Sequence, residues 1–257
     1  MRWDPSQYLR YADLRGRPFV ELTARIGADN PSYVVDLGCG TGELTATLAE
    51  RWPDGTVAGF DSSPEMIATA QQHAIPERLT FEVADLRSWK PQRPVDVLTA
   101  NAVLQWVPGH LEMLRDLADA LAPRGWLAFQ VPDNFDEPSH TLLRDLRLSP
   151  RWHEQLREGA DRTAGVERPD TYLRKLIDLG LHADVWQTTY QQVLQGQDAV
   201  LEWVKGTALR PVLSLLEDAT ERDEFLNEYS AALRDAYPQE AWGTPFPFRR
   251  TFAVGHR

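Results

Sequence analysis

The residues best suited to chemistry are an acid and three glycines at alternating positions. Asp36 is followed by Gly38, Gly40 and Gly42. Glycines at this spacing allow a sharp turn and let a ligand approach the backbone without a Cβ in the way. The N–H groups at the start of a following helix have no partner within that helix. This segment therefore predicts a ligand-binding loop rather than a plain strand-to-helix turn.

Two further acids follow predicted strands. Asp61 stands 19 residues after Gly42, where a carboxylate can accept both hydroxyls of a ribose. Asp85 precedes Leu86, so the carboxylate could accept from the exocyclic amine of adenine while the leucine packs on the ring. A solvated strand-end acid is the alternative for Asp85 taken alone. The three acids together predict a nucleoside ligand.

The glycine spacing argues against a dinucleotide site. Such a site requires G-x-G-x-x-G, but Glu43 occupies the position of the last glycine. Its carboxylate would repel a pyrophosphate. The neighbouring Asp36 suits a cationic amine better than a phosphate. A nicotinamide-dependent dehydrogenase is therefore disfavoured.

Alternating strands and helices position these residues. Short apolar runs predict strands at 33–37, 57–60, 79–83, 95–100 and 126–131, and helical spacing predicts helices at 44–51, 64–73 and 111–121. This alternation predicts a parallel sheet with helices on both faces. We expect two N-terminal helical pieces broken before Pro18. Ser62 and Glu65 have capping-box spacing for the helix that begins at Pro64.

After residue 132, strands and helices no longer alternate regularly. We expect loop and helix over 133–168, a helix over 172–179, a strand over 184–193, mostly helix over 199–237 and a last strand over 250–254. Late insertions of this kind tend to lie over the carboxyl ends of the strands. We expect one domain, 1–257, with N-terminal helices (1–30), a binding core (31–135) and helical cap segments (136–180 and 194–245).

Composition limits the partners. The 257 residues contain 38 Asp and Glu against 27 Lys and Arg, a net charge of −11, which argues against binding nucleic acid or anionic lipid. The only cysteine, Cys39, excludes an intrachain disulfide and a multi-cysteine zinc site, and we interpret it as a packing residue. With no apolar run of membrane-spanning length, we expect a cytoplasmic protein. Separately, we expect a monomer.

Several motifs together resemble the class I S-adenosylmethionine-dependent methyltransferases. They are the loop at 36–42, Asp61, Ala84-Asp85, Asp96 and the run 121–126. The resemblance implies a Rossmann-like, seven-stranded, mostly parallel α/β sheet with a helical cap, and S-adenosylmethionine as cofactor. Its glycine loop would face the methionine part of the cofactor. The implied cofactor-binding residues are Asp36, Gly38, Gly40, Gly42, Asp61, Ser62, Asp85, Leu86 and Asn101.

The methyl acceptor is a separate question. The Asn/Asp-Pro-Pro-aromatic motif of the amino-methylating nucleic-acid enzymes is absent, and no Cys-x-x-Cys or histidine cluster offers a metal. A hydroxyl or amine acceptor needs a general base, whereas a carboxylate is already anionic at pH 7. We expect no dedicated catalytic acid or base, with His110 and His140 in loop or cap roles.

Segments spread over the chain are similar to the branch of this family that methylates trans-aconitate. They include 3–9, 101–106, 186–190, 209–211 and 250–252. The resemblance implies a small polycarboxylate substrate and a monomethyl ester as product. Arginines suit such a substrate. The expected substrate-binding residues are Arg17, Trp106, Tyr190, Trp203, Arg210 and Arg250. Another small acid or hydroxyl acceptor, or a non-catalytic cofactor-binding regulator, stays open.

Overall fold

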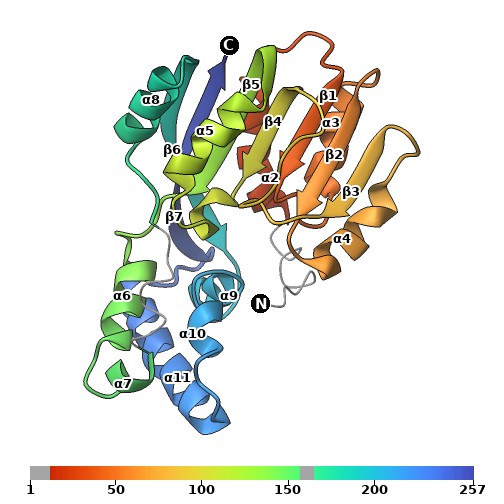
Figure 1. Cartoon of the computed structure of the whole chain (residues 1–257). Coiled ribbons are helices and arrows are strands. Elements are labelled where there is room, and N and C mark those ends of the chain that lie inside the picture. The colour runs from red at the N-terminus through yellow and green to blue at the C-terminus, as the bar shows by residue number, and fades with distance from the viewer. Residues whose placement is uncertain (1–11, 157–164) are drawn as a thin grey trace. The chain divides into compact units, whose positions relative to one another are not determined.

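The computed structural model describes residues 12–156 and 165–257, and its sheet has seven strands in the order β3-β2-β1-β4-β5-β7-β6. Strands β1 to β5 pair in parallel, whereas β7 runs opposite to β5 (Figure 1). The predicted α/β fold with a mostly parallel sheet is confirmed. The strands are Tyr33–Leu37 (β1), Thr56–Asp61 (β2), Leu79–Val83 (β3), Val95–Asn101 (β4), Leu121–Pro132 (β5), His182–Leu194 (β6) and Thr244–His256 (β7).

Helices connect the strands and make up most of the late part of the chain. The α-helices are Ala12–Ala24 (α2), Glu43–Arg51 (α3), Pro64–Ala70 (α4), His110–Asp119 (α5), Pro138–Arg147 (α6), His153–Leu156 (α7), Pro169–Asp178 (α8), Ala199–Lys205 (α9), Arg210–Leu213 (α10) and Ala219–Ala236 (α11). Two 3₁₀ helices are Gln71–His73 (η1) and Leu104–Trp106 (η2). No helix among these described residues has the length and apolar composition needed to cross a bilayer.

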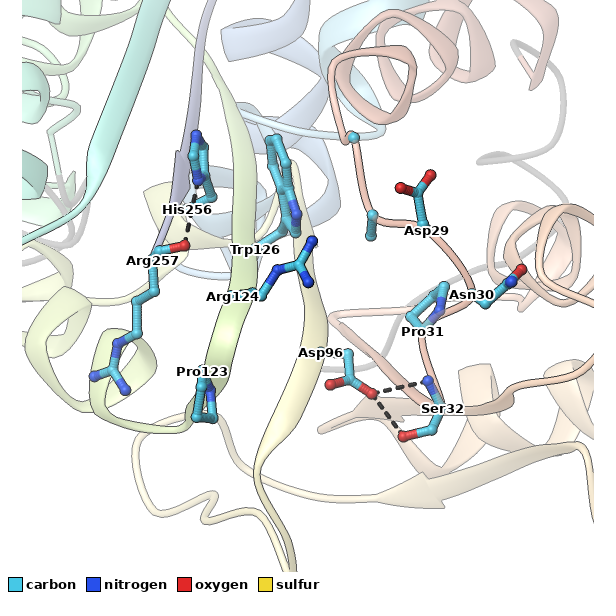
Figure 2. A pocket seen from close by; sticks show the side chains of 12 residues that line it. Asp29, Asn30, Pro31, Ser32, Asp96, Pro123, Arg124, Trp126, His256 and Arg257 are labelled. Atoms are coloured by element: carbon cyan, nitrogen blue, oxygen red, sulfur yellow. Dashed lines mark hydrogen bonds between the residues drawn. The ribbon is translucent and has the colours of Figure 1, made fainter.

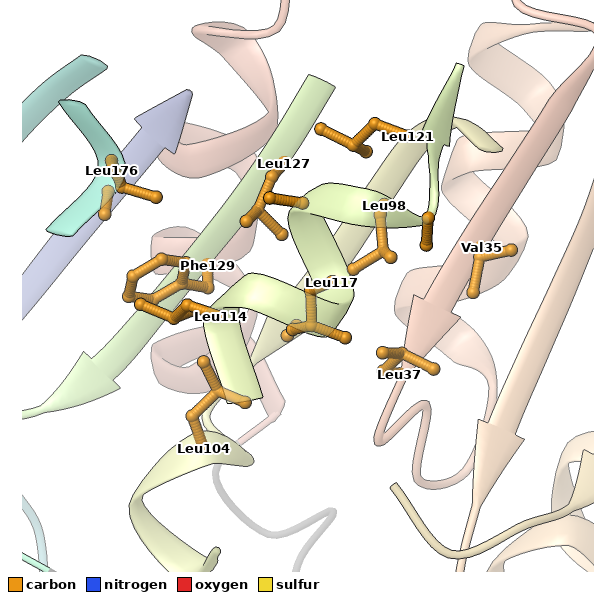
Figure 3. Packing of buried hydrophobic residues seen from close by; sticks show 14 of the residues in the cluster. Val35, Leu37, Leu98, Leu104, Leu114, Leu117, Leu121, Leu127, Phe129 and Leu176 are labelled. Atoms are coloured by element: carbon orange, nitrogen blue, oxygen red, sulfur yellow. The ribbon is translucent and has the colours of Figure 1, made fainter. Parts of the chain in front are cut away.

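One face of the sheet packs against α5 and α8. Leu114 and Leu117, one turn apart on α5, are buried with Leu98 of β4 and Phe129 of β5 (Figure 3). Leu176 of α8 joins the same cluster. Burial of each such side chain contributes roughly 1.5–3 kcal/mol. This packing holds β1, β4 and β5 together and so fixes the edge where their carboxyl ends lie.

The opposite face contains buried polar groups. Successive residues of a strand point to opposite faces, so Thr99 points away from the face that buries Leu98 and Ala100. The Thr99 hydroxyl contacts Asp36 of β1, which also bonds to Thr45 of α3. Helix α3 therefore covers the face opposite α5.

Helix α2 differs from the prediction because it continues through Pro18. A proline inside a helix costs about 3 kcal/mol or more. Phe19 and Leu22 are almost completely buried, and this burial offsets the cost. The break expected before Pro18 is wrong. The first predicted helical piece lies mostly outside the described residues.

Two predicted boundaries are also wrong. Leu121 starts β5 instead of ending the preceding helix, because it pairs with Val95 in the sheet. The cap of α4 is Ser63 rather than Ser62: the Ser63 hydroxyl accepts from the Met66 N–H at 3.2 Å. Pro64 is at the first helical position, as predicted.

The chain forms two compact units, with boundaries after Pro132, Gly165, Thr188 and Arg250. The first unit contains β1 to β5, α2 to α5, α8 and parts of β6 and β7. The second contains α6, α7, α9 to α11 and the remaining parts of β6 and β7. Helices α6 and α11 pack together in the second unit, where the Ser139 N–H donates to the Tyr237 hydroxyl at 3.0 Å.

Candidate functional site

The loop after β1 adopts a conformation that suits only glycine at two of its positions. Gly38 has a φ of 75°, and a Cβ there would lie 2.6 Å from the Val103 side chain. Gly42 has a φ of 83°, and a Cβ there would lie 2.8 Å from Ala70. The Gly38 and Cys39 N–H groups donate to the Phe60 carbonyl at 2.7 and 3.0 Å, which fastens the loop to β2. The residue spacing in the sequence therefore reflects close packing of the loop.

Asp61 connects the end of β2 to the middle of this loop. Its Oδ2 accepts from the Gly40 N–H at 3.0 Å, and its Oδ1 accepts from the Ser63 N–H at 2.9 Å. Burial raises the pKa of Asp61, although the backbone N–H groups oppose that rise. A Cβ at Gly40 would meet nothing within 4 Å. The loop therefore has an open side next to a partly buried carboxylate, which fits an approaching ribose.

Asp36 lies deeper and is held by two threonines. Its Oδ2 accepts from the Thr45 hydroxyl at 2.6 Å and its Oδ1 from the Thr99 hydroxyl at 2.7 Å. Burial raises its pKa to about 6, although both hydroxyls oppose the rise. In this arrangement, Asp36 fastens β1 to β4 and to the start of α3. Thr45 and Thr99 are not among the residues predicted from the sequence, although a polar residue within a buried element is a usable signal.

The residues expected around adenine lie in different environments. Asp85 forms a two-point ion pair with Arg87, at 2.5 Å between Oδ2 and Nη2, and this guanidinium lowers its pKa. Leu86 is buried in the core under α5, while Ser62 is exposed. The structure brings Asp36, Asp61 and the glycines together, and it places Asp85 in a separate surface pair. Adenine contacts by Asp85, Leu86 and Ser62 stay predictions.

Asn101 ends β4 beside Gln130 of β5. The Gln130 Nε2 donates to the Asn101 Oδ1 at 2.7 Å, and the two residues face each other in the strand register. Gln130 is completely buried and Asn101 half-buried. Gln130 is not among the residues predicted from the sequence. It is an isolated glutamine in an apolar strand, and only the register between β4 and β5 reveals that it lies beside Asn101.

Two residues predicted to bind substrate belong to the first unit. Arg17, on α2, pairs with Glu21 at 3.4 Å between Nε and Oε1. Trp106 ends η2 and is half-buried. Cys39 is buried, and burial raises the pKa of its thiol, which agrees with a packing role.

The other four belong to the second unit, where they are mostly buried. Trp203 of α9 packs edge-on against Phe248, with ring centroids 5.4 Å apart. The guanidinium carbon of Arg250 lies 4.9 Å from the centre of the same phenylalanine ring. Tyr190 is buried on β6, and Arg210 is half-buried at the start of α10. The fold thus brings Trp203 and Arg250 together around Phe248.

The two histidines considered as bases have local partners. His110 lies 2.7 Å from the Tyr172 hydroxyl through its Nε2, and burial lowers its pKa. His140 lies 3.0 Å from the Ser139 hydroxyl through its Nδ1, and burial lowers its pKa to about 4. Burial therefore favours the neutral form of both imidazoles. Within residues 12–156 and 165–257, no group of His, Cys, Asp or Glu could hold a metal ion.

A hollow of about 620 Å³ lies at the opposite ends of the strands, near the amino ends of β1 and β4 (Figure 2). It is lined by Ser32, which comes just before β1, and by Asp96 near the start of β4. Asp96 accepts from the Ser32 N–H at 2.8 Å and from its hydroxyl at 2.7 Å. This hollow is separated from the glycine loop by the length of the strands, so it is not the predicted nucleoside site.

Comparisons with known proteins agree with the loop geometry. A methyltransferase domain family matches residues 8–167. The chain is 52% identical to the trans-aconitate 2-methyltransferase of Streptomyces avermitilis, over 99% of this chain and 97% of that protein. It is 48% identical to the enzyme of the same name from Rhodococcus jostii, over 98% of both.

Solved structures show the same fold at low identity. The YcgJ protein of Bacillus subtilis is 16% identical, with a TM-score of 0.60 over 94% of this chain and 98% of that one. A putative methyltransferase of Haloferax volcanii, solved with its Trm112 activator, is 20% identical, with a TM-score of 0.56 over 98% of this chain and 94% of that one. Because of the matching family model and the two relatives that are 52% and 48% identical, the chain belongs to the trans-aconitate 2-methyltransferase family of S-adenosylmethionine-dependent methyltransferases.

Proposed function

We propose that this chain methylates a carboxylate of trans-aconitate and releases the monomethyl ester. The observation that supports this most strongly is the 52% identity, over nearly the full length of both chains, to an enzyme named for that reaction. The open glycine loop beside Asp61 supports the cofactor part of the proposal.

S-adenosylmethionine, when bound, supplies an electrophilic methyl group on a positively charged sulfur, and its transfer to a carboxylate oxygen leaves S-adenosylhomocysteine. The acceptor needs no deprotonation, because a carboxylate with a pKa near 4 is ionised at pH 7. No general base is therefore required of this chain. Its task is to hold two reactants in line and to exclude water, and such positioning can supply roughly 7–11 kcal/mol of the barrier.

The first unit provides the residues for the cofactor. In this proposal, Asp61 accepts from the ribose hydroxyls, since each of its oxygens has used only part of its accepting capacity on a backbone N–H. Asp36 positions the loop through its threonine contacts. The helix α3 behind Gly42 presents unpaired N–H groups toward the loop.

The residues proposed to bind the acceptor acid are Arg17, Trp106, Tyr190, Trp203, Arg210 and Arg250. A trianionic acid needs cations, and arginine can bind a carboxylate through two parallel hydrogen bonds. Arg250 is 4% exposed and lies over Phe248. A guanidinium in such a setting is weakly solvated, which strengthens its attraction for an anion.

A methyl-transfer assay with labelled S-adenosylmethionine tests the proposal. Trans-aconitate, cis-aconitate, isocitrate and citrate are compared side by side, and we expect trans-aconitate to give the fastest ester formation. A faster reaction with another acid would redirect the proposal to that substrate. Cofactor binding without turnover of any acid would favour a regulatory protein.

Substitutions test the arginines separately. We expect Arg210→Ala and Arg250→Ala each to raise the KM for trans-aconitate while the Kd for S-adenosylhomocysteine stays the same. Arg151→Ala is the matched control, because Arg151 lies in the same unit and bonds to Glu228 of α11 at 2.6 Å. An unchanged KM in both variants would remove these arginines from the acceptor site.

A further inference from the structure

The amide of Asn101 is held in one orientation by a buried neighbour. Gln130 is completely buried in β5, where an amide without hydrogen bonds would cost about 1–3 kcal/mol. Its Nε2 donates to the Asn101 Oδ1 at 2.7 Å. An amide has its oxygen and its NH₂ on opposite sides. Since the oxygen of Asn101 faces Gln130, the nitrogen lies on the other side of the amide, and the N–H trans to the oxygen points away from β5.

The backbone reinforces this orientation. The N–H of Ala102, the next residue, donates to the Gln130 carbonyl at 2.9 Å. Ala102 has a φ of 53°, a left-handed conformation that is unfavourable for alanine. The chain therefore turns sharply just after Asn101 while remaining bonded to β5. Strain of this kind concentrates at ligand sites.

The free end of this amide lies at the edge that holds the glycine loop. Leu37 pairs with Ala100 in the sheet, so the residues that follow them, Gly38 and Asn101, lie at the same edge. Gly38 also packs against Val103, two residues after Asn101. Within the described parts of the chain, the Asn101 NH₂ has no acceptor, and Asn101 is half-buried rather than covered. The two donors are therefore available to a ligand at this edge.

The ligand group that fits is a carboxylate. Its oxygens only accept, so an N–H of the amide can donate to one of them, and a neutral amide donates at every pH at which the enzyme works. Asp36 and Asp61, at the same edge, can only accept when ionised. We propose that the Asn101 amide, oriented by Gln130, donates to a carboxylate of the bound reactants.

Both reactants contain such a group: the acceptor acid has three carboxylates, and the methionine end of the cofactor has one. If the partner is a carboxylate of the acceptor acid, the inference rests on the proposed function. If the partner is the carboxylate of the cofactor, the inference depends only on cofactor binding. Asn101 is then a binding residue, and Gln130 is a positioning residue that acts through it.

Asn101→Asp replaces the donors with oxygen at almost unchanged size. Losing hydrogen bonds to a charged group costs roughly a factor of 10 to 100. If the acceptor is the partner, the KM for trans-aconitate rises by about this factor while the Kd for S-adenosylhomocysteine stays the same. If the cofactor is the partner, the Kd for S-adenosylhomocysteine rises, whereas that for its decarboxylated analogue does not.

Gln130→Leu tests the positioning role. We expect the same constant to change in the same direction by a smaller factor, with kcat changed less than KM. Gln71→Leu is the matched control, because Gln71, on η1, is a glutamine whose Nε2 likewise donates to an acceptor on a neighbouring element, the Phe81 carbonyl, at 2.8 Å. It should leave both constants unchanged. Asn101→Ser replaces Asn101→Asp if the latter fails to fold, as judged by its circular dichroism.

Two results would overturn the inference. One is an Asn101→Asp variant with wild-type values for both reactants. The other is equal weakening of S-adenosylhomocysteine and its decarboxylated analogue, which would show that the amide does not recognise a carboxylate. A wild-type protein that esterifies no acid contradicts the proposed function instead, and the two cofactor ligands still decide the role of Asn101.

Discussion

Two clusters of candidate site residues, one in each unit, are held by different kinds of contact. In the first unit, the acids near the glycine loop bond to groups from neighbouring elements: Asp61 to Gly40 and Ser63, and Asp36 to Thr45 and Thr99. In the second unit, Trp203 and Arg250 come from α9 and β7 and meet around a phenylalanine. The contacts described in the first cluster are hydrogen bonds, and those described in the second are a ring packed on a ring and a guanidinium over a ring.

This difference explains why the residues around the glycine loop are easier to recognise from the sequence than those around Phe248. The residues around the glycine loop follow a short turn and two adjacent strand ends, so their spacing in the sequence is constrained. Aromatic packing tolerates many sequences of similar volume. We therefore expect substitutions of the packed rings in the second unit to act through stability, and those at the open side of the loop to act through binding.

Trp203→Ala should have the largest effect. Trp203 is 2% exposed and packs on Phe246 and Phe248. Removing the ring should lower the free energy of unfolding by about 3–5 kcal/mol, measured by urea denaturation. Trp242→Ala is the control, because Trp242 is 56% exposed. Equal losses in the two variants would contradict the packing role of Trp203.

Two glycine substitutions compare packing with ligand access. Gly38→Ala places a methyl group 2.6 Å from Val103 and should cost about 2–4 kcal/mol of stability. Gly40→Ala pays only the conformational cost, about 1–2 kcal/mol, because its Cβ meets nothing within 4 Å. We expect Gly40→Ala nevertheless to weaken S-adenosylhomocysteine binding in calorimetry. A stable Gly40→Ala protein with unchanged affinity would place the cofactor elsewhere.

One buried titratable group from each unit, Asp36 and His140, should give opposite pH dependences. The pKa of Asp36 is raised from 3.8 to about 6, so its native state holds the extra proton between these values. Its stabilising contribution is present below pH 3.8 and is lost as pH rises through 6. The pKa of His140 is lowered from 6.5 to about 4, so its contribution is present above pH 6.5 and lost as pH falls toward 4.

Unfolding free energies between pH 4 and pH 7 test this pair. From pH 4 to 7, the wild type should lose up to about 3 kcal/mol relative to Asp36→Asn, and it should gain up to about 3 kcal/mol relative to His140→Gln. Parallel curves for wild type and both variants would mean that neither group has a perturbed pKa.

The last comparison is between two acids at strand ends. Asp61→Ala removes a half-buried acceptor and leaves the Gly40 N–H without its partner, so the Kd for S-adenosylhomocysteine should rise about 10- to 100-fold. Asp85→Ala should raise it less, because Asp85 is exposed and already paired with Arg87. Calorimetry with both variants decides the order, and a larger effect at Asp85 would reverse our ranking.

The sequence by itself determined the alternation of strands and helices from β1 to β5, the position of the glycine loop and the acids beside it. These features are local: period-2 and period-3.6 hydrophobic patterns specify the elements, and residues at strand ends meet because parallel strands end at one edge. Family resemblance then extended the prediction to the cofactor and the substrate class.

Tertiary structure decided what those patterns could not contain. Pairing of Asn101 with Gln130, and of Asp36 with Thr99, depends on the register between strands that are far apart in sequence. Helix α2 continues through Pro18 because burial elsewhere on the helix outweighs a local penalty. Each of these outcomes depends on contacts between residues that are distant in the sequence. Such contacts form only when the chain folds.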